Sequence, residues 1–429
     1  MGIVEQVLRF LSETVGARPV GSPNNLEALR YLSALAKRWG FTVHELPFEC
    51  LSWEHRASFI RVGPDTIPVY PGPYSPPLSG SYRIARASSV EALRDCEFCG
   101  GLLVIHGALA EEPLMPTDFP FYFPDEHREI IELIHAGAPA GILALTGKHP
   151  LCGLSPFPLF EDGALGIANA FASAEHLASF FAAELRNESV EIEIASRTAP
   201  ARGTQAVFRK PGEAEVLSDC DPEGQDRRML VCAHMDTKYD TPGALDNAAG
   251  VAVMMAVMQR LQADASLTAV EFVPFNGEEY FGVSGQLAYL ECLRADRRRG
   301  VTAADRHLDL PDAPEEPTSP VELVLNIDGV GLRGSGTALS SHNSPKLDLC
   351  GLPGSGAQIA HGEPWVAGDH SIFAFRGIPC LALTSSTIMT EGITLTHTPA
   401  DTAEKIDFEL LEVTADAAAE LVRRFLRRS

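Results

Sequence analysis

Residues 229–250 read MLVCAHMDTKYDTPGALDNAAG, and the fold can be predicted outward from them. The first five residues, Met229–Ala233, predict a buried strand, because a short continuous apolar run is typical of a strand covered on both faces. The strand ends at His234, and a loop with Asp246 leads into the apolar helix Gly250–Leu261. The stretch therefore predicts a strand–loop–helix unit with its polar residues gathered in the loop.

Strands and helices continue to alternate through the rest of the chain from about residue 201. Apolar runs predict further strands at 269–275, 321–327 and 378–383, and a helix at 408–427. This alternation predicts an α/β fold with a mixed, mostly parallel central sheet and helices on both faces.

Residues 55–200 have a different sequence pattern, in which short β-like runs follow one another between Pro- and Gly-rich turns. The runs lie at 57–62, 66–70, 101–106, 141–145, 164–168 and 190–195. We therefore predict one domain from residues 1–54 and 201–429, with a β-rich domain inserted at 55–200. The charged, Pro-rich stretch between Arg294 and Pro320 is predicted to be a surface loop.

The charge of the chain excludes some classes of partner. It has 429 residues, of which 57 are acidic and 34 basic, giving a formal charge of −23. Such a surface repels phosphate backbones and anionic lipids, so we expect neither nucleic-acid nor membrane binding. The N-terminal residues lack the features of a secretory signal, which favours a cytoplasmic location with reduced cysteines. We interpret Cys96 and Cys99 as ordinary cysteines near a turn, rather than a zinc clip or redox pair.

Polar side chains follow the predicted strands at the points where those strands end. In chain order these are His234, Glu278, Glu279 and Asp328, while Asp246 lies on a loop that enters a helix. In an open α/β sheet, ligands bind beyond the carboxyl ends of the strands, so we expect these side chains at one rim.

Four of these side chains and a later histidine have the chemistry of metal ligands. They are His234, Asp246, Glu279, Asp328 and His397. Two imidazoles with three carboxylates favour zinc over calcium, although cobalt or manganese can use the same ligands. Five ligands are too many for one tetrahedral zinc with an open position, so they predict two ions that share a bridging carboxylate. A lone histidine at a strand end is more often a hydrogen-bonded core residue, but the accompanying acids would be costly to bury without a cation.

The segments around these residues resemble the co-catalytic zinc exopeptidase family, which includes bacterial leucyl aminopeptidases, glutamate carboxypeptidase and the transferrin receptor ectodomain. The matching segments are Ala233–Asp236, Pro242–Gly250, Gly277–Glu279, Asn326–Gly331, Gly368–His370 with Gly377–Pro379, and His397–Asp401. Residues 55–200 are similar to the protease-associated domain that many family members carry, on the basis of Ala136–Leu143.

The resemblance implies a role for each ligand. His234 and Asp328 would hold one zinc ion, Glu279 and His397 would hold the other, and Asp246 would bridge the two. Many relatives have Asp-Asp where this chain has Leu245-Asp246, and Asp246 is taken as the ligand because Asn247 follows it.

The resemblance also implies roles for residues beside the ligands. Glu278 resembles the general base that deprotonates a water held between the zinc ions and later protonates the leaving amine. Asp236 would accept the other N–H of the His234 imidazole, although it also suits a turn. Asp369 and His370 resemble an Asp-His pair near the substrate pocket, or else cap a helix.

By analogy with the family, the expected activity is that of a zinc-dependent aminopeptidase acting on peptides or amino-acid amides. A carboxypeptidase or small-amide hydrolase is the main alternative, and it would need a cation for the terminal carboxylate. Lys238, Lys346 and Arg376 are the candidates. A non-catalytic binding protein and a glutaminyl-cyclase-like transferase rank lower. Side-chain preference and homo-oligomer formation are left open.

Overall fold

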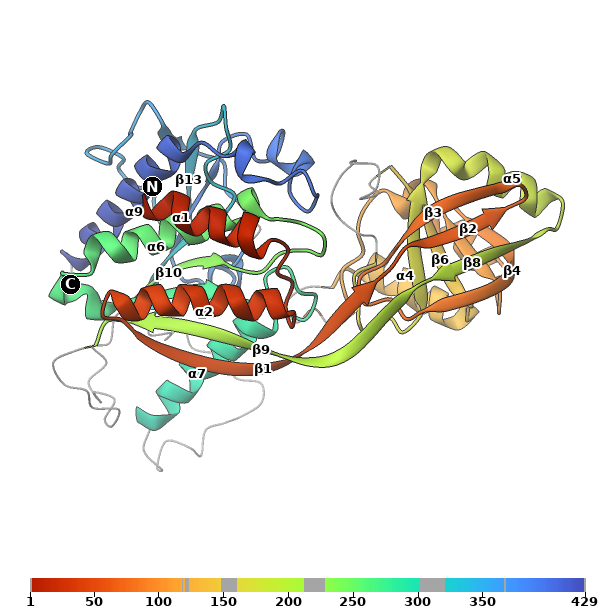
Figure 1. The fold of residues 1–429 in the computed structure, drawn as a ribbon, viewed down its shortest axis with the longest axis horizontal. Coiled ribbons are helices and arrows are strands. Elements are labelled where there is room, and N and C mark those ends of the chain that lie inside the picture. Colours follow the sequence, from red (N-terminus) through yellow and green to blue (C-terminus); the bar gives the residue numbers. More distant parts are fainter. Residues whose placement is uncertain are drawn as a thin grey trace. The chain divides into compact units, whose positions relative to one another are not determined.

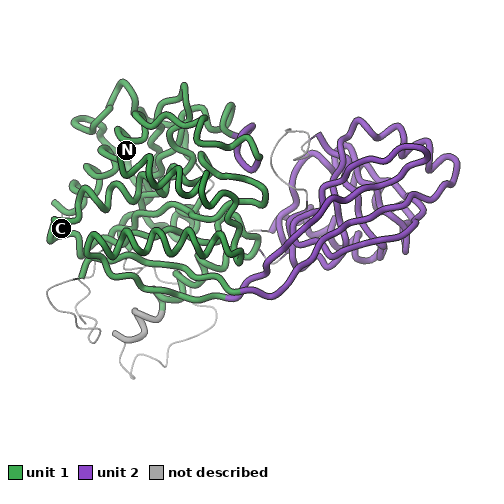
Figure 2. The backbone as a smooth tube through the Cα atoms, viewed as in Figure 1, with its two compact units in different colours: residues 1–48, 202–392, 399–429 green, residues 49–201, 393–398 purple. Residues whose placement is uncertain are grey.

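The structure is a computed structural model that describes residues 2–117, 119, 123–147, 160–211, 228–300, 321–365 and 368–427. The chain divides into two compact units (Figure 2). Unit 1 comprises residues 1–48, 202–392 and 399–429, and unit 2 comprises residues 49–201 with 393–398. Unit 2 therefore interrupts unit 1 in the sequence.

Unit 1 contains an eight-stranded sheet in the order β1-β9-β11-β10-β12-β15-β13-β14. Its neighbouring strands β1 and β9 are labelled in Figure 1. The strands are β1 (Thr42–His55), β9 (Ser196–Arg209), β10 (Arg228–His234), β11 (Val270–Phe275), β12 (Val321–Ile327), β13 (Thr337–His342), β14 (Ile359–His361) and β15 (Cys380–Ser385). β10 pairs in parallel with β11 and β12, and β12 pairs in parallel with β15. β11 is antiparallel to β9, and β13 is antiparallel to β15. The sheet is thus mixed, with a parallel centre, and the α/β class is as predicted.

Helices enclose this sheet. They are α1 (Ile3–Arg9), which continues as a π-helical segment over Phe10–Val15, α2 (Pro23–Arg38), α6 (Ala249–Leu261), α7 (Ser284–Gly300), α8 (Ser371–Ala374) and α9 (Phe408–Leu426). α6 contacts β10 and β12 and packs with α1 and α9. Every residue of β11 is buried, as expected for a strand covered on both faces. Phe272 of this strand contacts Phe41, and Phe275 contacts Tyr289 of α7.

The sequence located the central elements better than the peripheral ones. The predicted strands 229–233, 269–275, 321–327 and 378–383 correspond to β10, β11, β12 and β15. β13 was not predicted, because its Thr337–His342 segment is short and partly polar. The predicted loop Arg294–Pro320 is wrong at its start, since α7 runs to Gly300, and its remainder lies outside the described residues.

Unit 2 contains a closed barrel in the order β2-β3-β7-β6-β5-β4-β8. Its strands are β2 (Ser58–Val62), β3 (Asp65–Pro71), β4 (Leu78–Ala87), β5 (Leu102–Ile105), β6 (Gly141–Thr146), β7 (Ala168–Ser173) and β8 (Ser189–Ile194), and its helices are α3 (Val90–Asp95), α4 (Asp125–Gly137) and α5 (Leu177–Leu185). The strand predicted at 164–168 is wrong, because β7 begins only at Ala168. The similarity of residues 55–200 to a protease-associated domain stays a prediction.

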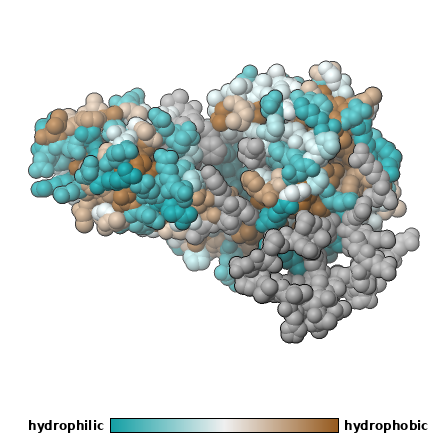
Figure 3. Space-filling view, turned by 180° about the vertical axis from the view of Figure 1, so that it is seen from behind, coloured by the Kyte–Doolittle hydropathy of each residue, from teal (hydrophilic) through white to brown (hydrophobic). Residues whose placement is uncertain are grey.

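Hydrophilic and hydrophobic residues are interspersed on the face shown in Figure 3. A few large apolar side chains are exposed, among them Leu185 and Phe375, as is common on protein surfaces. Cys96 and Cys99 are both free thiols. None of the helices in the described part of the chain has the length and apolar character needed to cross a membrane.

Candidate metal centre

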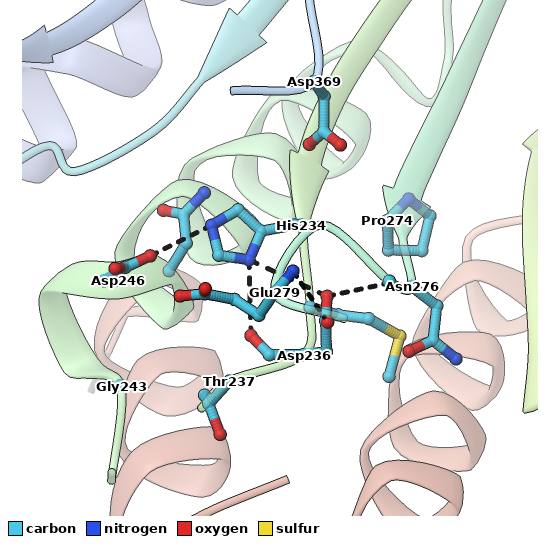
Figure 4. Close-up of polar contacts among 12 residues, drawn as sticks. His234, Asp236, Thr237, Gly243, Asp246, Pro274, Asn276, Glu279 and Asp369 are labelled. Carbon is cyan, nitrogen blue, oxygen red and sulfur yellow. Dashed lines mark hydrogen bonds and ion pairs between the residues drawn. The ribbon is translucent and has the colours of Figure 1, made fainter. Parts of the chain in front are cut away.

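The first group of candidate ligands forms where two neighbouring parallel strands end. His234 is the last residue of β10, and Asp328 directly follows β12, which pairs with β10. The His234 Nε2 atom lies 3.0 Å from Asp246 Oδ1 (Figure 4). It lies 3.5 Å from Asp328 Oδ1. The strand-end argument therefore placed these side chains at the same rim of the sheet.

The second group consists of Asp246, Glu279 and His397. One ligand atom from each of these residues lies within 4.8 Å of the others, and the same limit holds for the first group. Glu279 follows β11, and His397 lies in the segment 393–398, whose flanking residues on both sides belong to unit 1. Asp246 is common to both groups, which is the position expected of a bridging carboxylate.

The distances in the first group fit a zinc ion. Zinc bound tetrahedrally to nitrogen and oxygen at roughly 2.0–2.1 Å separates its ligand atoms by about 3.4 Å. The separations of 3.0 Å and 3.5 Å from the His234 Nε2 atom are close to this value. Each group also has the mixture of imidazole and carboxylate that zinc prefers.

The charges of the site fit a cation as well. Burial raises the pKa of Asp328, and the carboxylates of Asp246 and Glu279 raise it further. Burial opposes protonation of His234, yet the Asp328 and Asp246 carboxylates raise its pKa well above the ordinary value. A divalent ion among these groups would offset the repulsion between the carboxylates and favour their ionised forms.

Glu278 lies beside these ligands. Burial, together with the charges of Glu279 and Asp369, raises the pKa of Glu278 well above its ordinary value. His234 lowers the pKa of Glu278, because a positively charged imidazole ring favours the ionised carboxylate. A carboxyl group with a raised pKa is suited to exchange protons near neutral pH.

Asp236 makes different contacts from those predicted. Its Oδ1 accepts the main-chain N–H of Gly277 at 3.0 Å, and its Oδ2 accepts the N–H of Glu279 at 3.1 Å. The Nδ1 atom of His234 is 3.8 Å from Asp236 Oδ1 but 3.3 Å from the main-chain oxygen of Asp236. The predicted carboxylate–imidazole hydrogen bond is therefore replaced by a main-chain contact, because the carboxylate binds the loop that carries Glu279.

The loop that carries Asp246 is held by a residue whose function the sequence did not indicate. Asp401 accepts the main-chain N–H of Leu245 at 2.6 Å and that of Asp246 at 3.0 Å. Asn247, which follows a cis peptide bond, donates to the main-chain oxygen of Ile327 at 2.9 Å. The position of Asp401 in the His397–Asp401 motif was the available signal, but only the fold shows its partners.

Asp369 and His370 lie in the interior near the first group. His370 has no exposed surface, and its Nε2 donates to the main-chain oxygen of Trp365 at 2.7 Å, so its Nδ1 is free to accept from Asn326. Asp369 Oδ1 accepts from Gln286 Nε2 at 2.9 Å, and burial raises the pKa of Asp369 to about 7. In Figure 4 the Asp369 carboxylate points towards the side on which His234 lies. Substrate binding by this pair stays a prediction.

Lys238 also reaches the candidate ligands. Its Nζ donates to the main-chain oxygen of Glu279 at 2.8 Å and lies 3.2 Å from Glu279 Oε2. Lys238, one of the three cations considered for a carboxylate pocket, thus contacts a candidate ligand.

Several proteins are similar to this chain. The model of peptidase family M28 matches residues 215–422. An aminopeptidase from Aneurinibacillus sp. strain AM-1 is 18% identical, with a TM-score of 0.67 over 98% of this chain and 92% of that one. The zinc aminopeptidase BSAP from Bacillus subtilis is 17% identical, with a TM-score of 0.67 over 98% and 94%. A peptidase M28 precursor from Shewanella amazonensis SB2B is 17% identical, with a TM-score of 0.63 over 98% and 92%.

No curated protein sequence matches this chain. At these identities, the solved structures show that the fold is shared. The family match confirms the resemblance seen in the motifs, and it spans every candidate ligand from His234 to His397. The chain therefore carries a domain of peptidase family M28.

Proposed function

We propose that this chain is a zinc-dependent aminopeptidase that binds two zinc ions and hydrolyses the N-terminal peptide bond of peptides or amino-acid amides. The observation that carries the proposal is the convergence of two ligand groups that share Asp246. The family match and the aminopeptidases among the structural neighbours support it. In this proposal, His234 and Asp328 bind one ion, Glu279 and His397 bind the other, and Asp246 bridges them.

Two bound zinc ions would polarise the scissile carbonyl and lower the pKa of a water molecule. Glu278 takes a proton from the attacking water and transfers it to the leaving amine, because its carboxyl lies beside the ligands and has a raised pKa. Asp236 and Asp401 hold the ligand-bearing loops, so the ligands keep their positions during the reaction.

A carboxypeptidase is the second candidate, and Lys238 is the observation that favours it. Its ammonium group lies at the site, where it could bind a terminal carboxylate. However, this group already contacts the carboxylate and the main-chain oxygen of Glu279. Because Lys238 already neutralises Glu279, it is less able to bind a substrate carboxylate. The aminopeptidase is therefore the better supported function.

The test compares dipeptides and amino-acid amides that have a free amine with the same compounds carrying an N-terminal acetyl group. The purified chain is first stripped of metal and then loaded with zinc, and its bound zinc is counted. We expect two zinc ions per chain and hydrolysis of the free-amine substrates alone. Preferred hydrolysis of the acetylated peptides would favour the carboxypeptidase, and a chain that binds no zinc would contradict both.

A further inference from the structure

Arg18 is a fully buried cation that none of the candidate roles uses. It lies between the π-helical segment Phe10–Val15 and α2, more than 200 residues before the first candidate ligand, and it has no exposed surface. The part of the chain that the M28 family model matches begins only at residue 215.

The guanidinium group of Arg18 binds both ends of the loop that joins His234 to Asp246. Its Nε donates to the main-chain oxygen of Met235 at 2.6 Å, directly after His234. Its Nη1 donates to the main-chain oxygen of Pro242 at 2.7 Å, and its Nη2 donates to that of Gly243 at 3.0 Å. Both acceptors lie just before the segment that carries Asp246. Because the guanidinium is planar and rigid, these bonds set the distance between the two ends of the loop.

The same N-terminal segment also reaches the loop that carries Glu278 and Glu279. Asn25 Nδ2 donates to the main-chain oxygen of Arg18 at 3.1 Å and to Asn276 Oδ1 at 2.8 Å. Asn276 Nδ2 in turn donates to Asn25 Oδ1 at 3.0 Å. Both asparagines are buried, so the paired amides form a fixed connection.

Arg18 also places a positive charge close to the acidic groups of the site. Burial lowers the pKa of Arg18 to about 10, so the guanidinium stays charged at neutral pH. The charges of Asp401 and Asp236 raise the pKa of Arg18, and so do those of Asp246 and Glu279. The guanidinium therefore reduces the repulsion between these carboxylates before any metal is bound.

We propose that Arg18 and Asn25 are positioning residues for the metal centre: together they hold the His234–Asp246 loop and the Asn276–Glu279 loop at the spacing that two zinc ions require. This proposal rests on the proposed zinc site. It assigns the N-terminal segment a role in metal affinity, in addition to its contribution to folding.

The test measures zinc affinity of the full chain by competition with a chromophoric chelator, well below the unfolding temperature. The variants are Arg18→Lys, Arg18→Met and Asn25→Ala, each checked for folding by circular dichroism. Asn24→Ala is the matched control, because the Asn24 side chain donates to Val15 and Ala17 of the same segment but to neither ligand-bearing loop. Unfolding by urea in the absence of metal measures any purely structural effect.

We expect Arg18→Lys and Asn25→Ala to weaken zinc binding about 10-fold and Arg18→Met up to about 100-fold, the range seen when partners of metal ligands are removed. Asn24→Ala should stay within about twofold of the wild type, as most surface substitutions do. If Arg18→Met does not fold, the zinc affinities of Arg18→Lys and Asn25→Ala decide whether the proposal holds.

Zinc affinities of Arg18→Lys and Asn25→Ala equal to that of Asn24→Ala would overturn the proposal, even if both variants were less stable without metal. A wild-type chain that binds no zinc would instead contradict the proposed function itself, so the two failures are distinguishable.

Discussion

The carboxylate of Asp236 accepts the main-chain N–H of Glu279 at 3.1 Å, and it accepts the N–H of Gly277 with its other oxygen. A residue two positions after His234 therefore holds the loop that delivers the ligand of the second group. In this way the end of β10 and the end of β11 are joined by one side chain, which places candidate ligands from both strands in a single site.

Asp236→Asn should weaken zinc binding by about 10- to 100-fold. An amide offers one oxygen and one NH2 group, so one of the two main-chain N–H groups would face a donor instead of an acceptor. The measurement is a competition titration with a chelator. Asp95→Asn removes an exposed carboxylate from unit 2 and serves as the control, and an equal effect of both changes would contradict this role.

Glu278→Gln should lower kcat by about 10²- to 10⁴-fold, the usual contribution of a general base. The amide has the same size but does not accept a proton. Zinc content should be unchanged, whereas Glu279→Gln should reduce zinc content, because Glu279 belongs to a ligand group. Steady-state kinetics and metal analysis check both variants. Unchanged turnover of Glu278→Gln would remove it as the base.

Asp246→Asn and Asp328→Asn should differ in how many zinc ions each variant retains. Asp246 belongs to both ligand groups, whereas Asp328 belongs to one. We therefore expect Asp328→Asn to keep one tightly bound ion and Asp246→Asn to keep neither. Metal analysis after dialysis against a weak chelator makes the comparison. Two ions retained by Asp246→Asn would exclude a bridging role.

His370 should make the stability of the protein depend on pH. Burial lowers the pKa of His370 from 6.5 to about 4. The unfolded state therefore binds a proton below pH 6.5 that the folded state does not, so the free energy of unfolding falls as the pH falls from 6.5 towards 4. Between pH 7 and pH 5 the loss from this group is about 2 kcal/mol.

Urea unfolding of the wild type and of His370→Gln, at both pH values and with a chelator present, checks this expectation. The variant lacks the titrating ring, so its stability should change less with pH. The same pH dependence in both proteins would mean that other titrating groups determine it, among them the carboxyl of Asp369, whose pKa is also raised into this range.

The sequence allowed the centre of the fold to be predicted, because β10, β11 and β12 are mostly apolar, as is typical of parallel strands buried on both faces. Strands farther from the centre were harder to predict. β13 is short and contains polar residues, and its place beside β15 depends on antiparallel pairing with a strand about 40 residues away. The strand at 164–168 was misplaced because an apolar run does not indicate where pairing begins.

Residue types and local patterns were enough to indicate which side chains have metal-binding chemistry, and that His234, Glu279 and Asp328 follow strand ends. The contacts that hold these side chains in place depend on the packing of the folded chain. Asp236 binds the amide of Glu279 instead of the imidazole of His234, and Arg18 binds the loop that begins at Met235. Hydrogen bonds form over about 3 Å, so their partners depend on how distant segments pack, which no local pattern specifies.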